Sequence, residues 1–309
     1  MSIRTEAPQP ILLGEYSGVG LLRLALSLYR KNYSAIAFTF AAIFLPIALV
    51  AILIRQASPV GGVAIGLLFA FGYFASFGPL TFTISDICLG NIPTLRRSYG
   101  AYFRGGLWLR TLWTLILIYI YVLAFVLIAS VAVGIIAFLA DYMTQSATLS
   151  VSLSVVLALA AYVFLLYLIF RIQFAQSIVV IEKRSANDAI RRSLSLSRHS
   201  FWRILAVALL SFVVLVTAQA VIYALVIGIG RVTGLSSDFS SDFFAASLGD
   251  SAPALGAASP PGPFATAVMG IAQLTIVPVT VILNVLLYYE LRVRQESYDV
   301  RALYEDMMR

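Results

Sequence analysis

The sequence predicts an all-α, polytopic helical membrane protein, and two observations carry the prediction. Its 309 residues are 61% hydrophobic and only 11% charged, whereas soluble domains carry about 25% charged residues. Apolar stretches of roughly 20 residues, the length that a membrane helix needs, recur along most of the chain. The stretch from Trp113 to Ile136 does not alternate in polarity, which disfavours a transmembrane β-barrel.

Six membrane spans are expected. Each must be helical where it faces lipid, because hydrocarbon offers no partner for unpaired backbone groups. Pro46, Pro79 and Pro278 lie inside the first, second and sixth spans and mark places where those helices can bend. The expected spans are residues 34–54, 62–89, 107–139, 151–180, 201–229 and 264–291.

Arginine and lysine residues are divided unequally between the two sides that these spans define. One side collects the cations of the amino-terminal segment, of loops 90–106 and 181–200, and of the segment after the last span. The other side has only Arg55 and Arg231, together with several aspartates. Positive residues are enriched on the cytoplasmic side. We therefore expect a multi-pass protein of the bacterial cytoplasmic (inner) membrane, with both termini in the cytoplasm.

Three short segments on the cytoplasmic side combine an apolar stripe with arginines at helical spacing. They are LLRLALSLYRKNY (21–33), LRRSYGAYFR (95–104) and IRRSLSLSRHSFWR (190–203). Each leads into an odd-numbered span. The expected apolar stripes are Leu22, Leu26 and Tyr29 in the first, Leu95, Tyr99 and Tyr102 in the second, and Ile190, Leu194 and Phe201 in the third.

This order predicts three copies of one unit, a basic amphipathic helix followed by a transmembrane hairpin. We treat the chain, 1–309, as a single membrane domain. Its repeat units are 16–90, 93–180 and 187–291, the third containing a flexible external loop at 231–263, and residues 292–309 form a cytoplasmic tail.

The cations of the three amphipathic helices are candidate contacts for lipid headgroups or for an acidic partner. Such helices lie at the membrane surface with apolar sides toward acyl chains and arginines among the phosphates. Each cation near an anionic leaflet contributes about 1 kcal/mol. The alternative is that these cations only fix the topology and anchor the spans. The candidates are Arg23, Arg30, Lys31, Arg96, Arg97, Arg104, Arg191, Arg192 and Arg198.

Five polar side chains fall inside the expected spans. A charge at membrane depth is costly, so Arg171 either reaches the inner surface or pairs with Asp86 or Glu290. Interhelical hydrogen bonds account for the amides, and a substrate path through these groups is the alternative. The five are Asp86, Arg171, Gln219, Gln273 and Asn284.

Catalytic and metal-binding motifs are not found in the sequence. It contains no GxSxG, no HExxH and no glycine-rich phosphate loop before a helix. Cys88 is the only cysteine and His199 the only histidine, and they lie far apart in the chain. We expect no metal and no cofactor, and whether the protein is an enzyme stays open, with a non-enzymatic role favoured.

Three stretches resemble the membrane domain attached to some bacterial glycerophosphodiester phosphodiesterases, which also occurs in stand-alone six-span proteins. They are LLRLALSLYRKNY, IVVIEKRSANDAIRRSLSLSRHSFWRILAV (178–207) and YYELRVRQESYDV (288–300), with Ser297 where that family would have glycine. The soluble phosphodiesterase of the family is a barrel of about 250 residues, which no segment here could form. The resemblance therefore implies a membrane module without the catalytic domain.

These observations favour a non-enzymatic inner-membrane protein that organises lipid or serves as an accessory subunit of a larger membrane complex. The main alternative is a transporter or channel for a small or lipidic solute, and the third is a membrane enzyme acting on lipid headgroups. The expected partners are membrane lipids of the anionic inner leaflet, with a protein partner or a second copy of the chain as further alternatives. Nucleic acid is not expected, because the cations are spread over separate short loops.

Overall fold

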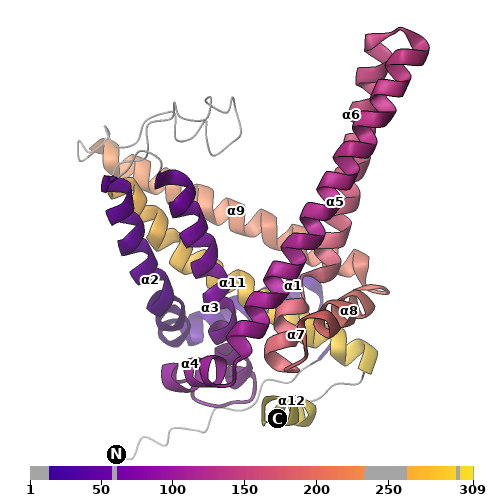
Figure 1. The fold of residues 1–309 in the computed structure, drawn as a ribbon. Helices are drawn as coiled ribbons and strands as arrows, with labels where there is room; N and C mark the ends of the chain where they lie inside the picture. Colours follow the sequence, from indigo (N-terminus) through magenta and orange to yellow (C-terminus); the bar gives the residue numbers. More distant parts are fainter. Residues whose placement is uncertain (1–13, 58–60, 233–262, 297–299, 309) are drawn as a thin grey trace, which may run out of the picture.

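A computed structural model describes residues 14–57, 61–232, 263–296 and 300–308. Within these residues the only regular secondary structure is helix, as predicted (Figure 1). The amino-terminal part forms α1 (Gly18–Lys31), α2 (Tyr33–Ala57) and α3 (Gly61–Cys88). Ser17 caps α1, because its hydroxyl oxygen accepts a hydrogen bond from the Gly20 N–H at 3.0 Å.

The remaining helices repeat this order of one short helix followed by long ones. The middle part contains α4 (Leu95–Arg104), α5 (Leu107–Thr144), α6 (Ala147–Ile172) and α7 (Ala175–Ile181). The last part contains α8 (Ala186–Ser197), α9 (Phe201–Val232), α11 (Pro263–Glu296) and α12 (Val300–Met308). The three predicted copies of a basic amphipathic helix followed by a transmembrane hairpin stay a prediction.

Four helical segments are long and apolar enough to cross a membrane. They are Leu107–Thr144, Thr148–Ile181, Phe201–Ile222 and Ile276–Glu296. None of the residues in the apolar windows of the first two is buried inside the protein, whereas most of those in Ile276–Glu296 are. The chain is therefore a membrane protein by the length and composition of its helices.

The α5–α6 hairpin projects away from the rest of the molecule, and the α2–α3 hairpin rises on the other side of it (Figure 1). Helix α9 crosses between the two hairpins in the same view. The α5–α6 hairpin exposes large apolar side chains along its length, Leu127, Ile128 and Phe138 among them. An exposed apolar surface of this extent is stable in lipid but not in water.

The hydrophobic core lies where the hairpins meet. The carboxyl-terminal half of α11, from Val279 to Leu291, is buried almost throughout and packs with the inner half of α3, with α7 and with α1. All seven residues of α7 are buried. Together these helices form a packed body from which the longer helices extend.

The structure adds detail to two predicted boundaries. The expected fourth span, 151–180, falls within the candidate span Thr148–Ile181, and a turn at Gln173 and Phe174 divides this segment into the exposed α6 and the buried α7. Helix α11 continues to Glu296, so the first residues of the expected tail, from Arg292, are helical. Ion pairs described below hold this last turn in the body, which hydropathy alone does not reveal.

The apolar faces of the three basic helices were expected to face acyl chains, and this is wrong for most of the apolar residues of α1 and α8. In α1 the buried residues are Leu21, Leu22, Ala25, Leu28 and Tyr29, all packed in the protein core, whereas Leu26 is exposed. Helix α8 buries Ile190 and Leu196 in the same way. Most of the apolar side of α1 and α8 is therefore covered by protein, while the cations of these helices face outward.

Helix α4 is held against α2 and α3 by polar contacts as well as by packing. The Tyr99 hydroxyl donates to the Thr39 carbonyl oxygen at 2.5 Å, and burial raises the pKa of Tyr99 to about 12. The hydroxyl oxygens of Ser98 and Thr83 lie 2.9 Å apart. Leu95, expected in the apolar stripe, is exposed, because the face that contacts α3 is centred on Ser98 and Tyr102 instead.

Candidate functional site

The basic helices α1, α4 and α8 all lie at the end of the molecule opposite the tips of the two hairpins (Figure 1). Eight of the nine candidate cations on them are exposed, and Arg192 is half-buried. The side chains of seven form no hydrogen bond or ion pair with another described residue. These seven are Arg23, Arg30, Lys31, Arg96, Arg104, Arg191 and Arg198.

The other two candidates form ion pairs within the protein. Arg97 of α4 lies 3.3 Å from a carboxylate oxygen of Asp86, which is 1% exposed near the end of α3. Arg192 of α8 pairs with Glu296, and its Nε lies 3.6 Å from Glu182. A buried carboxylate requires a partner of this kind, so Arg97 and Arg192 join helices rather than present free charge.

Two buried carboxylates, Glu182 and Glu290, connect helices at the basic end. Sequence spacing gave no reason to place them together. Glu182, after α7, accepts a hydrogen bond from the Tyr288 hydroxyl at 2.7 Å. Glu290 of α11 accepts hydrogen bonds at 2.9 Å from Arg203 Nε and from Arg294 Nε. The sequence signal was available, since both glutamates end an apolar run and are followed closely by arginine.

Arg292 completes this network between α11 and α12. Its Nη1 donates to Asp306 at 2.8 Å and to the Tyr288 hydroxyl at 3.1 Å, while its Nε donates to Glu296 at 3.1 Å. Helix α12 is thereby fixed to the body, and Leu303 of the same helix is fully buried. The carboxyl-terminal segment is a structural part of the basic end.

Arg171 pairs with neither of the carboxylates considered from the sequence. Near the end of α6, its Nη2 donates to the Leu194 carbonyl oxygen at 2.6 Å and its Nε to the Ser197 hydroxyl at 3.3 Å. The Ser193 hydroxyl donates to the Arg171 carbonyl oxygen at 2.7 Å. Arg171 therefore joins α6 to α8, and carbonyl dipoles of α8 stabilise its charge.

The remaining intramembrane polar residues do not share one set of contacts. Asn284 of α11 accepts a hydrogen bond from the Ser177 hydroxyl at 3.1 Å. Gln219 is half-buried in α9, and the side chain of Gln273 lies outside the described part of the chain. Asp86, Arg171 and Asn284 thus each contact different partners, as interhelical hydrogen bonding predicts.

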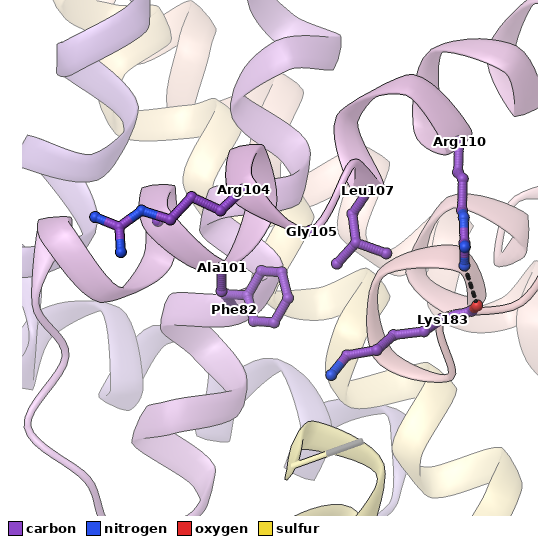
Figure 2. Close-up of a pocket in the computed structure, with 8 residues that line it drawn as sticks. Phe82, Ala101, Arg104, Gly105, Leu107, Arg110 and Lys183 are labelled. Carbon is purple, nitrogen blue, oxygen red and sulfur yellow. Dashed lines mark hydrogen bonds between the residues drawn. The ribbon is translucent and has the colours of Figure 1, made fainter.

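A pocket of about 490 Å³ opens where α4, α5 and the turn after α7 meet (Figure 2). Arg104, Arg110 and Lys183 bring three cations to its lining, and no lining residue is acidic. Its apolar lining comes from Phe82, Ala101 and Leu107, and its glycines are Gly100 and Gly105.

The pocket cations are held in different ways. Arg110 Nη1 donates to the Lys183 carbonyl oxygen at 2.8 Å, which fixes the α5 wall to the turn after α7. Figure 2 shows the Lys183 side chain extending from that turn toward the apolar wall, and the Arg104 guanidinium pointing away from Leu107. Burial lowers the pKa of Lys183, while the nearby Asp306 carboxylate acts in the opposite direction.

Metal binding receives no support from the residues that the structure describes. They contain no group of three or more histidine, cysteine, aspartate or glutamate side chains that could hold an ion. Cys88 is buried in the core beside Ile84 and Ile87. The groups assembled at the basic end are therefore cations, hydroxyls and carboxylates paired with arginine.

Comparisons with known proteins give a family but no activity. No curated protein and no solved structure matches the chain. The model of a family described as a domain of unknown function, DUF7847, matches residues 22–291. The predicted likeness to the membrane domain of glycerophosphodiester phosphodiesterases stays a prediction. Because the match extends from α1 nearly to the end of α11, the chain belongs to the DUF7847 family.

Proposed function

We propose that the protein is a non-enzymatic, six-span protein of the bacterial inner membrane that binds and organises anionic phospholipid at its cytoplasmic face. One observation carries the proposal. Seven cations without partners among the described residues lie on three helices at one end of the molecule, and the apolar hairpins extend from that end. Cations clustered beside apolar spans attract anionic headgroups.

The aromatic residues of α5 indicate where the bilayer lies. Tryptophan and tyrosine gather at membrane interfaces, and Trp113 and Tyr142 are both exposed on α5. Tyr142 lies 29 positions after Trp113, a separation of about 44 Å at 1.5 Å per residue. A bilayer with its headgroups is about 40–45 Å thick, so Trp113 marks the inner interface and Tyr142 the outer one.

Six spans follow when α2 and α3 are added to the four long apolar helices. These two helices have 25 and 28 residues, enough to cross the hydrocarbon core at about 20 residues. An even number of spans puts both termini on the side of the basic helices. The positive-inside rule makes that side cytoplasmic.

Burial of the apolar faces strengthens the proposal. A helix that only floats on a membrane can turn or leave it, whereas α1 and α8 are fixed to the body by core residues such as Leu21 and Leu196. Their cations are consequently presented in a constant arrangement. At about 1 kcal/mol for each cation near an anionic leaflet, seven cations supply several kcal/mol of attraction for anionic lipid.

The intramembrane polar residues contact different helices, which favours lipid binding over transport as the function. A pathway would place Asp86, Arg171 and Asn284 along one route, yet their hydrogen bonds and ion pairs join three different pairs of helices. Each is satisfied by a protein partner. They support helix packing more directly than passage of a solute.

The test compares lipids bound to the purified full-length protein. The triple variant Arg23→Gln/Arg30→Gln/Lys31→Gln removes the free cations of α1, and native mass spectrometry in mixed phosphatidylglycerol and phosphatidylcholine micelles measures the bound lipid. We expect the preference for phosphatidylglycerol to fall several-fold. The control Arg55→Gln changes a cation in α2 on the opposite side of the membrane and should leave the preference unchanged. Equal preference in all three proteins would refute the proposal.

A further inference from the structure

We infer that the pocket between α4, α5 and the turn after α7 binds a phosphate group, carried by a lipid headgroup or free in solution. The inference deepens the proposed function and rests on it for the lipid source, because it assigns one discrete site within a surface that is basic in general. Within the described part of the chain, this pocket brings Arg104, Arg110 and Lys183 to one lining.

The charge of the lining selects an anion. Arg104, Arg110 and Lys183 all line the cavity and no carboxylate does. The Arg104 guanidinium points away from Leu107 (Figure 2), so Arg110 and Lys183 are the cations that a ligand would contact. Arg110 uses one N–H on the Lys183 carbonyl oxygen, and its other N–H groups have no partner among the described residues. Guanidinium and ammonium groups together match the tetrahedral oxygens of phosphate.

The geometry of the cavity is set before a ligand arrives. The hydrogen bond of 2.8 Å from Arg110 to Lys183 joins the two basic walls. Lys183 has a φ of 54°, in the left-handed region that favours glycine. A lysine at such a position costs about 1 kcal/mol of backbone strain, which glycine would avoid.

The apolar half of the lining fits the carbon part of a phospholipid. Phe82, Ala101 and Leu107 lie opposite Lys183 in Figure 2. Trp108, next to Leu107, is partly exposed at the start of α5, near the interface that Trp113 marks. A phosphate held by the basic wall would place its glycerol and acyl groups along these residues and toward the bilayer.

Two variants test the site without disturbing the fold. Lys183→Gly removes the ammonium group and suits the positive φ at least as well as lysine. Gly100→Leu keeps every charge but fills the cavity, because a Cβ at Gly100 meets only the Arg104 guanidinium, at 3.9 Å. The control Arg198→Gln removes an exposed cation of α8 that does not line the pocket.

Native mass spectrometry of the full chain in detergent measures the dissociation constants of dihexanoyl phosphatidic acid, dihexanoyl phosphatidylcholine and inorganic phosphate. Loss of a charge-assisted hydrogen bond weakens binding by about tenfold, so Lys183→Gly and Gly100→Leu should each raise the constant for phosphatidic acid by that factor. Arg198→Gln should leave the dissociation constant for phosphatidic acid unchanged. Displacement of phosphatidic acid by inorganic phosphate identifies a free phosphate site, and resistance to it identifies a headgroup site.

The outcomes separate this inference from the proposed function. If Lys183→Gly and Gly100→Leu bind all three ligands as the unaltered protein does, the pocket is not a phosphate site. The proposed function still stands in that case, provided that the α1 triple variant loses its lipid preference. If phosphatidic acid binding falls in the pocket variants while the triple variant keeps its preference, the pocket site stands and the general basic surface does not.

Discussion

The α5–α6 hairpin and the long helices α3 and α11 of the body are both apolar in sequence, yet they have opposite environments. The apolar windows of the hairpin contain no residue that the protein buries, whereas most of the Ile276–Glu296 window is buried. The difference lies in the polar residues. The inner half of α3 contains Thr81, Thr83, Ser85 and Asp86, all buried, while α5 has no polar residue of this kind from Leu115 to Ile128.

This contrast teaches how apolar helices choose between lipid and protein. Lipid tails are as apolar as leucine, so helices in a membrane associate through close packing and hydrogen bonds. The body has such contacts, among them the Ser85 and Tyr289 hydroxyl oxygens at 2.5 Å. Beyond Thr114 the hairpin has few such contacts with other helices, and its large side chains stay exposed. The predictions below compare one change in the body with a matched change in the hairpin.

The largest effect is expected from Glu290→Gln, which leaves Arg203 and Arg294 without their buried carboxylate. Glu290 is 1% exposed and accepts hydrogen bonds from both arginines. Breaking a buried ion pair from one side costs about 3–5 kcal/mol. The free energy of unfolding, measured by denaturant titration in detergent, should fall by about 3 kcal/mol, because the arginines are partly exposed.

Asp141→Asn is the matched change in the hairpin. Asp141 is exposed near the end of α5, and surface substitutions of this kind change stability by about 0.5 kcal/mol or less. An equal loss of stability in both variants would contradict the distinction between body and hairpin.

The second prediction compares two leucines of the same size. Leu286 in α11 is 3% exposed and Leu127 in α5 is 56% exposed. Large-to-small changes in a packed core cost about 2–5 kcal/mol, so Leu286→Ala should lower the unfolding free energy by about 2–3 kcal/mol. Leu127→Ala should lower it by less than about 1 kcal/mol, since detergent or lipid fills the space. A protein partner on the hairpin within the purified sample would reverse this ranking.

The third prediction compares two helical glycines. A Cβ at Gly78 of α3 would lie 2.1 Å from the Tyr102 ring of α4, and Tyr102 is itself buried. Gly78→Ala should therefore cost about 1–3 kcal/mol through overpacking. Nothing lies within 4 Å of a Cβ at Gly134 in α5, so Gly134→Ala should stabilise the helix by up to about 1 kcal/mol. Thermal shift in detergent measures both, and a stabilised Gly78→Ala would show that α3 and α4 pack less closely.

The smallest effect concerns pH, at the junction of the two regions. Burial lowers the pKa of Lys183 from its ordinary value of 10.5, and the neighbouring charges are Arg104 on α4, Arg110 on α5 and Asp306 on α12. Below its pKa the ammonium is charged and attracts phosphate, and this attraction is lost as pH rises through the lowered pKa. Binding of dihexanoyl phosphatidic acid should therefore weaken as pH rises, and the loss should be evident below the ordinary lysine pKa of 10.5. Lys183→Arg, which stays charged, should flatten the profile; an identical profile would assign the pH dependence to another group.

Much of the fold was predictable from the pattern of residues. The long helices begin and end within a few residues of the expected spans, because apolar runs and the charges that end them determine helix limits in a membrane protein. The basic helices were visible from arginines at helical spacing beside an apolar stripe. Which individual residues are buried was less predictable, since Leu26 and Leu95 are exposed. Periodicity predicts which side of a helix is apolar, but the neighbouring helices determine which residues of that side are buried.

The candidate site was harder to predict, because its parts come from distant segments. Arg97 and Arg192 look like other surface cations in the sequence, yet they pair with Asp86 and Glu296 across helices. The pocket joins Phe82, Arg104, Arg110 and Lys183 from four elements. Sequence spacing places none of these pairs together, since the contacts depend on how the helices cross.

The sequence by itself determined that this is an all-helical membrane protein with its cations gathered on short segments between apolar helices. That result follows from composition and period, which are local properties of the chain. Only the tertiary structure decided which helices pack into the body, which stay exposed, and which cations have no partner among the described residues. Those outcomes depend on the pairing of buried charges and on close contacts between helices, and both arise between residues that are far apart in the chain.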